Sequence, residues 1–150
     1  MFERILIATD GSKFGEKAAK VGIELAKLSG GKVIIVYVAD INKYTSSTGL
    51  ISPFGGPSPE AIDNVVANIR EAGEKATLHV KELARASGVE SDRLIVEGNP
   101  PSEILRIAED DKIDVIVMGS IGKTGLEKFL MGSVAEKVVH DSKLPVLIVR

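Results

Sequence analysis

The sequence predicts an α/β fold in which a doubly wound sheet of five parallel strands carries helices on both faces. Two observations lead to this prediction. Five short runs rich in Ile and Val are almost continuously apolar, which is typical of strands covered on both faces. Segments with helical periodicity separate these runs, and this alternation indicates β-α units joined by right-handed crossovers. The predicted strands are Arg4–Thr9, Lys32–Val38, Arg93–Glu97, Asp114–Met118 and Pro145–Val149.

Two helices are predicted from their ends as well as from their apolar stripes. The first runs from Lys13 to about Leu28, with Ser12 as a suitable N-cap. It ends at Gly30-Gly31, because glycine readily adopts the left-handed conformation that follows a helix. The second, Pro59–Ala86, keeps one apolar stripe along its whole length and stops before Gly88.

Two further helices are predicted in the second half of the chain, and one segment before them is predicted to be a loop. A helix over Pro101–Asp110 starts with proline, which the first helical turn tolerates. Before the last strand, Ser133 and Glu136 have the spacing of a capping box in which Ser133 is the N-cap. The segment Ala39–Pro59 is polar and proline-rich, so we expect a long loop there, either a variable surface excursion or a lid or partner contact.

The composition limits the classes of protein to which this chain can belong. The 150 residues fit one domain, 1–150, and the absence of Cys excludes disulfides and thiolate metal sites. The formal net charge of −2 and an aromatic content of 4% argue against a nucleic-acid partner. The apolar runs are too short to span a bilayer, and the N-terminal residues lack a secretory pattern. We therefore expect a cytoplasmic protein without a membrane partner.

The segment after the fourth predicted strand is the most informative candidate site. In open α/β sheets, ligands bind beyond the carboxyl ends of the strands. Gly119, Gly122 and Gly125 lie between a strand and a helical region, and glycines let backbone N–H groups approach an anion. The helix that starts near Gly132-Ser133 adds free N–H groups and a partial positive charge. These two segments predict a phosphate-binding site.

Two similar motifs can be rejected. Gly122-Lys123-Thr124 is similar to the end of a Walker A loop, but the position that this motif requires to be glycine is Val117. The first strand-to-helix turn, residues 10–15, lacks the glycine spacing of a dinucleotide-binding fingerprint.

The glycine spacing resembles that of a known family. Gly119, two residues, Gly122, nine residues and then Gly132-Ser133 is similar to the ATP-binding pattern of universal stress proteins. Ile5–Ser12, Asp114–Ser120 and Pro145–Val149 also resemble family segments, so the resemblance covers nearly the whole chain. It implies a flavodoxin-like strand order, 3-2-1-4-5, and a homodimer formed through the C-terminal strand. An apolar edge strand independently invites such pairing.

The resemblance also implies a set of site residues. Val38 would contact adenine through its backbone, and Thr9 and Asp10 would lie near the ribose. Asp10 is the candidate residue for a metal, Mg or Mn, held through the nucleotide phosphates. The ligand would be ATP, with ADP or AMP as alternatives. The residues that would hold the phosphates or line the same pocket are Met118, Gly119, Ser120, Gly122, Gly132, Ser133 and Val134.

One departure from the family pattern bears on activity. Many ATP-binding members have a histidine where this chain has Ile121, and the apolar residue removes a phosphate contact and weakens the case for hydrolysis. We assign no catalytic residue. The sequence favours an ATP-binding homodimeric protein of stress response or regulation. An unknown protein partner would recognise its nucleotide-dependent conformation. The alternatives are a dimeric interaction module that binds no nucleotide, and a weak ATPase with slow or partner-stimulated turnover.

Overall fold

The computed structural model describes residues 1–43, 55–56, 58–122 and 131–150. All five predicted strands are present, parallel, and in the order β3-β2-β1-β4-β5, so the predicted fold class and strand order are confirmed. The strand ends differ from the prediction by one or two residues. The elements in chain order are β1 (Arg4–Ala8), α1 (Lys13–Ser29), β2 (Lys32–Ala39), α3 (Pro59–Ala86), β3 (Ser91–Glu97), α4 (Pro100–Asp110), β4 (Val115–Gly119), α5 (Ser133–Asp141) and β5 (Val146–Val149).

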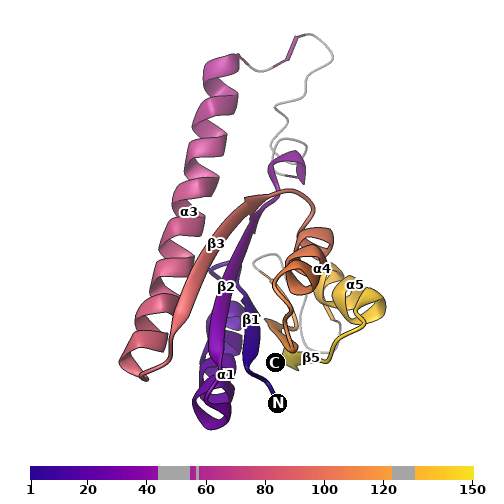
Figure 1. The fold of residues 1–150 in the computed structure, drawn as a ribbon. Helices are drawn as coiled ribbons and strands as arrows, with labels where there is room; N and C mark the ends of the chain where they lie inside the picture. The colour runs from indigo at the N-terminus through magenta and orange to yellow at the C-terminus, as the bar shows by residue number, and fades with distance from the viewer. Residues whose placement is uncertain (44–54, 57, 123–130) are drawn as a thin grey trace.

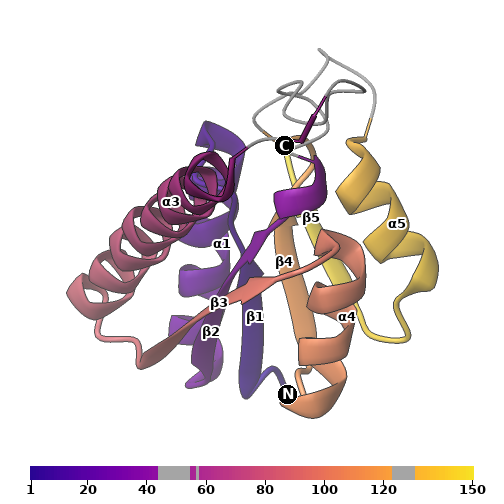
Figure 2. The ribbon, with the colours of Figure 1, turned by 90° about the horizontal axis from the view of Figure 1, so that it is seen from above.

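Helices cover both faces of the sheet, as Figures 1 and 2 show: α1 and α3 lie on one side, and α4 and α5 on the other. Alternate residues of each central strand therefore enter different apolar cores. Ile5 and Ile7 pack with α1, while Leu6 between them packs with α4 and α5. All three are fully buried. None of the helices among the described residues is long and apolar enough to cross a membrane.

Helix α1 begins and ends as its sequence predicts. The Ser12 hydroxyl accepts a hydrogen bond from the Gly15 N–H at 3.1 Å, which caps the helix at its N-terminus. At the other end Gly30 has φ 71°, in the left-handed region, and its N–H donates to the Ala26 carbonyl. These two caps fix where α1 enters and leaves the sheet.

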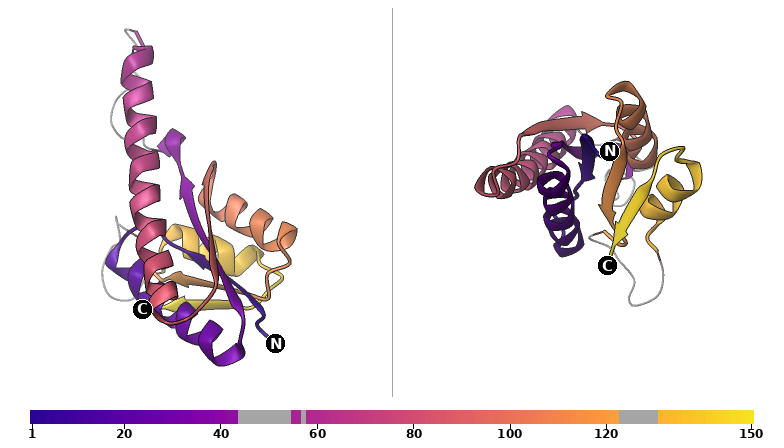
Figure 3. Two further views of the ribbon diagram at one scale, coloured as in Figure 1. Left: turned by 60° about the vertical axis from the view of Figure 1, so that its left-hand side comes forward. Right: turned by 60° about the horizontal axis from the view of Figure 1, so that its bottom comes forward.

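Helix α3 has the predicted bounds and is longer than the sheet it covers. Its 28 residues span about 42 Å at 1.5 Å per residue. Its buried residues run from Ile69 to Ala84, in the C-terminal part of the helix. The N-terminal part extends beyond the strands (Figures 1 and 3).

The capping prediction for α5 is wrong. Gly132, not Ser133, is the N-cap, and no side chain caps this helix. The Gly132 carbonyl already accepts the Glu136 N–H at 2.9 Å, so the first turn starts one residue earlier than the Ser-x-x-Glu spacing suggests. Ser133 is the first helical residue. Helix α4 likewise starts one residue earlier, at Pro100, after an Asn99 cap.

Parts of two predicted loops lie outside the described residues. They are residues 44–54 and 57 of the predicted loop 39–59, and residues 123–130 between β4 and α5. The glycine segment is therefore described only for Gly119–Gly122 and from Met131 onwards.

Gly73 sets the distance between α3 and β2. A Cβ at position 73 would lie 2.7 Å from Cδ1 of Tyr37, closer than side chains approach. The missing side chain therefore lets the Tyr37 ring pack directly against the helix.

We expect Gly73→Ala to destabilise the protein by about 1–3 kcal/mol, because overpacking against Tyr37 outweighs the gain of about 1 kcal/mol in helix propensity. Urea unfolding of Gly73→Ala, Tyr37→Ala and the double variant measures this. In the Tyr37→Ala background the same substitution should be neutral or stabilising. A Gly73→Ala variant more stable than the wild type would show that the contact does not limit packing.

Candidate functional site

All ten predicted site residues lie at the carboxyl end of the sheet: Val38 near the end of β2, and the others around the topological switch point between β1 and β4. Strands β1 and β4 are neighbours, with Ala8 opposite Met118. The helix after β1 covers one face of the sheet and the helix after β4 covers the other. In open α/β sheets, ligands bind beyond the ends of two neighbouring strands whose connections diverge in this way. Segments 9–12, 119–122 and 132–134 lie at this place, which is called the crevice below.

The Asp10 carboxylate links the β1 end of this crevice to the β4 end. Its Oδ1 accepts the Ser12 N–H at 2.9 Å, which orders the turn into α1. Its Oδ2 lies 2.6 Å from where a Cβ would stand on Gly122. Position 122 therefore has room for glycine alone without displacing the carboxylate, which lies on the β1 side of the crevice.

A second close approach packs α1 against the end of β4. A Cβ at Gly119 would lie 3.0 Å from the backbone carbonyl of Phe14. On the same side, the buried Thr9 hydroxyl accepts the Gly11 N–H at 3.2 Å. Gly119 and Gly122 thus have packing roles within the protein, besides any role toward an anion.

Ser120 ties the start of the glycine segment to its end. The Ser120 carbonyl accepts the Gly132 N–H at 2.7 Å, and the Ser120 N–H donates to the Val149 carbonyl at 2.9 Å. The Gly132 N–H is therefore already bonded, which the sequence did not indicate. The first turn of α5 still presents N–H groups, at Ser133 and Val134, that have no carbonyl partner within the helix.

The apolar candidates lie on the α4 and α5 side of the sheet. Met118 is buried, and Val38 and Val134 are partly buried against the same core. Val38 belongs to β2 and Met118 to β4, and β1 lies between these two strands. The structure therefore surrounds the crevice with apolar side chains on one face and with Asp10 on the β1 side.

Tyr37 is a neighbour of the site that sequence reasoning missed. Burial, and after it the negative charge of Asp10, raises the pKa of the Tyr37 hydroxyl above its usual value. The hydroxyl therefore loses its proton only at a higher pH than a free tyrosine does. The sequence feature that could have identified Tyr37 is its position directly before the end of an apolar predicted strand.

The described residues offer no ready-made metal site. They contain no group of three or more His, Asp or Glu side chains that could hold a metal ion. A divalent ion here would need most of its ligands from a bound molecule, with the Asp10 carboxylate as a protein ligand. This chemistry fits a metal carried on phosphate oxygens.

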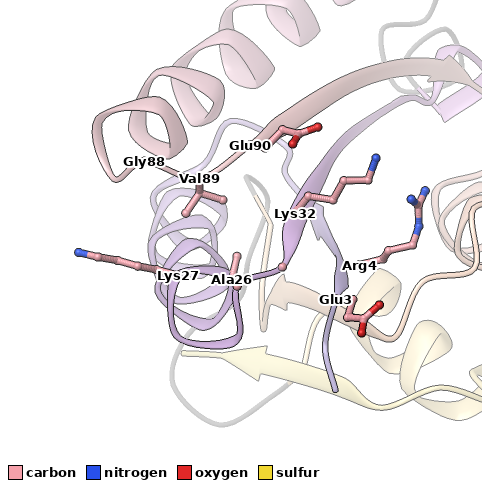
Figure 4. Close-up of a pocket in the computed structure, with 10 residues that line it drawn as sticks. Glu3, Arg4, Ala26, Lys27, Lys32, Gly88, Val89 and Glu90 are labelled. Atoms are coloured by element: carbon pink, nitrogen blue, oxygen red, sulfur yellow. The ribbon is translucent and has the colours of Figure 1, made fainter.

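A hollow of about 540 Å³ lies at the opposite, amino end of the sheet (Figure 4). It is lined by Glu3, Arg4, Ala26, Lys27, Gly30, Gly31, Lys32, Gly88, Val89 and Glu90. Charges of both signs mix there, and α1 and α3 end beside it with their carbonyl groups, which disfavour an anion. It is distant from every predicted site residue.

The comparisons with known proteins agree with the fold. The model of the universal stress protein family matches residues 1–150. Universal stress protein MJ0531 of Methanocaldococcus jannaschii is 39% identical over the whole chain and 83% of its own length. The solved structure of MJ0577, from the same organism, matches with a TM-score of 0.82 and 33% identity, over 99% of this chain and 96% of that one.

Two similar structures contain nucleotides. A universal stress protein in complex with cAMP matches with a TM-score of 0.64 and 25% identity, over 99% of this chain and 97% of that one. One from Archaeoglobus fulgidus in complex with dAMP matches with a TM-score of 0.65 and 23% identity, over the full length of both chains. With a family match over its whole length and relatives above 30% identity, this chain belongs to the universal stress protein family.

Proposed function

We propose that this protein binds an adenine nucleotide, ATP in the first place, in the crevice beyond β1 and β4, and acts as a cytoplasmic homodimeric regulator of the stress-response type. One observation carries the proposal. Segments 9–12, 119–122 and 132–134 converge at the topological switch point, beside the N-terminus of α5. The cAMP and dAMP complexes of similar proteins support an adenine nucleotide as the ligand class.

The phosphates would bind at the start of α5. The Ser120–Gly132 hydrogen bond holds this helix end against the β4 segment, so the N–H groups of Ser133 and Val134 share one location. These N–H groups and the helix dipole favour an anion. The opposite wall is the backbone of residues 119–122, where Gly119 lies against Phe14 and Gly122 against the Asp10 carboxylate.

The nucleoside would lie across the strand ends. Val38, Met118 and Val134 supply apolar surface for adenine, and the backbone of Val38 supplies polar groups for its edge. Thr9 and Asp10 supply hydroxyl and carboxylate oxygens on the β1 side, where a ribose would lie. With ATP bound, Asp10 stands near the phosphates, and Mg²⁺ or Mn²⁺ on the phosphates would offset its charge.

A second copy would pair at the edge strand β5. The carbonyls of Pro145 and Val149 accept from Ile116 of β4 and from Ser120 directly after it, so alternation turns the backbone groups of Val146 and Ile148 toward the open edge. Leu147 between them is 38% exposed. A two-fold axis at Leu147 would pair Val146 of one copy with Ile148 of the other, as in an isologous dimer. Nucleotide binding would order the segments around the crevice, and a protein partner would recognise the ordered conformation.

We expect Gly132→Val to lower the affinity for ATP at least about 10-fold, which corresponds to about 1.4 kcal/mol. A Cβ at position 132 would lie 3.2 Å from the Ser120 carbonyl oxygen, so the larger side chain must shift the start of α5. Calorimetry with ATP and Mg²⁺ measures the affinity. Gly56→Val is the matched control, since none of the described residues has an atom within 4 Å of its Cβ position.

The outcomes separate the proposed function from its alternatives. Unchanged ATP affinity in Gly132→Val would contradict the site assignment. A wild-type protein that binds none of ATP, ADP, AMP or cAMP would instead identify a dimeric interaction module. Phosphate release from wild-type protein with bound ATP would identify a weak ATPase.

The charge of Asp10 should make ATP binding depend on divalent cations. We expect wild-type affinity for ATP to fall several-fold when EDTA removes Mg²⁺, and the affinity of Asp10→Asn to change much less. The asparagine oxygen can still accept the Ser12 N–H, so the turn is kept. Titrations of both proteins with and without Mg²⁺ measure this. An equal Mg²⁺ dependence in the two proteins would show that Asp10 does not lie near the phosphates of bound ATP.

A further inference from the structure

Ser120 connects the two surfaces to which the proposed function assigns binding. Its N–H donates to the carbonyl of Val149, the last residue of β5, at 2.9 Å. Its carbonyl accepts the N–H of Gly132, the cap of α5, at 2.7 Å. Ser120 itself is only 7% exposed. One buried residue after β4 therefore holds both the end of the edge strand and the start of the helix that would bind phosphate.

Side chains join the same two elements. Val146 and Ile148 of β5 pack into the apolar core that contains Ala135 and Val138 of α5. A displacement of β5 relative to β4 would therefore reach α5 by two routes, the Ser120 backbone and this core.

The end of β5 is well suited to exist in two states. The strand has four residues and, among the described strands, pairs with β4 alone. The Ser120–Val149 bond is the last of this ladder, and terminal bonds of a short edge strand open most readily. When it is closed, Ser120 is fixed from both sides. When it opens, the start of α5 loses one of the anchors that hold it beside the crevice.

We propose that nucleotide binding at α5 and pairing of β5 with a second copy of this chain strengthen each other through Ser120. A phosphate on the first turn of α5 favours the closed state, because it fixes Gly132 and through it Ser120. A second strand bonded to the backbone of Val146 and Ile148 favours the same state by holding β5 in place. Two ligands that select one state are coupled, and the coupling is reciprocal. The inference rests on the proposed function.

Sedimentation equilibrium of the wild-type protein with and without saturating ATP and Mg²⁺ tests the coupling directly. ATP should lower the dimer dissociation constant at least about 5-fold, the lower end of typical coupling factors. Because the dimer would hold two nucleotide sites, reciprocity requires the ATP affinity of each site to rise by the square root of that factor, at least about 2-fold, when the protein concentration passes from below to above the dimer dissociation constant.

The variant Leu147→Lys supplies the second arm. It places like charges across the expected two-fold axis, so the protein should be monomeric and its ATP affinity should equal that of dilute wild-type protein. Leu78→Lys is the matched control: it changes an exposed leucine of α3 that is 46% accessible and lies outside β5 and the site, and should leave both quantities unchanged.

Each other outcome is decisive. A monomeric Leu147→Lys protein with the ATP affinity of the wild-type dimer overturns the coupling, as does a dimer constant that ATP does not change. A wild-type protein that binds ATP but stays monomeric also overturns the coupling and leaves the nucleotide site standing. A dimer that binds no nucleotide at any concentration overturns the proposed function itself.

Discussion

The close packing of α1 against the segment after β4 is the constraint on which the candidate site depends. Two glycines allow it: Gly119 lies against the Phe14 backbone, and Gly122 against the Asp10 carboxylate. Because neither glycine has a side chain, α1 and the turn before it pack directly against the end of β4 and the residues after it. The glycines have this role whether or not a ligand is present, so their spacing reflects the architecture of the crevice as well as its chemistry.

The direction of the helices gives the two ends of the sheet opposite electrostatic character. Parallel strands joined by helices place every helix N-terminus at the carboxyl end of the sheet and every helix C-terminus at the other. The hollow at the amino end is therefore the less suitable place for a phosphate. The helix dipoles and the converging segments both favour the carboxyl end of the sheet as the place for an anion.

Much of the fold follows from the sequence because local signals agree with tertiary ones. The bounds of α3 were predictable because Pro59 starts the helix, an apolar stripe continues to Ala84, and Gly88 follows. The strand order came from the family resemblance. The cap of α5 was not predictable: Ser-x-x-Glu spacing does not reveal that Gly132 is bonded to Ser120 and already accepts from Glu136.

The contacts of the site were less accessible to sequence reasoning than its location. Glycine spacing and strand ends identified the crevice. They did not show that Tyr37 lies near Asp10 or that Ser120 bonds to Val149, since both depend on how neighbouring strands and helices pack. Local patterns thus predict at which end of the sheet a ligand would bind, and tertiary structure determines how the residues there are connected.

The most direct measurement of the central claim is an NMR titration of isotope-labelled protein with ATP and Mg²⁺, read at assigned backbone amides. The account predicts the largest chemical-shift changes at residues 9–12, 119–122 and 133–134, and little change around Gly30, Gly88 and Glu90. Changes concentrated at the amino end of the sheet, with the crevice unaffected, would contradict it.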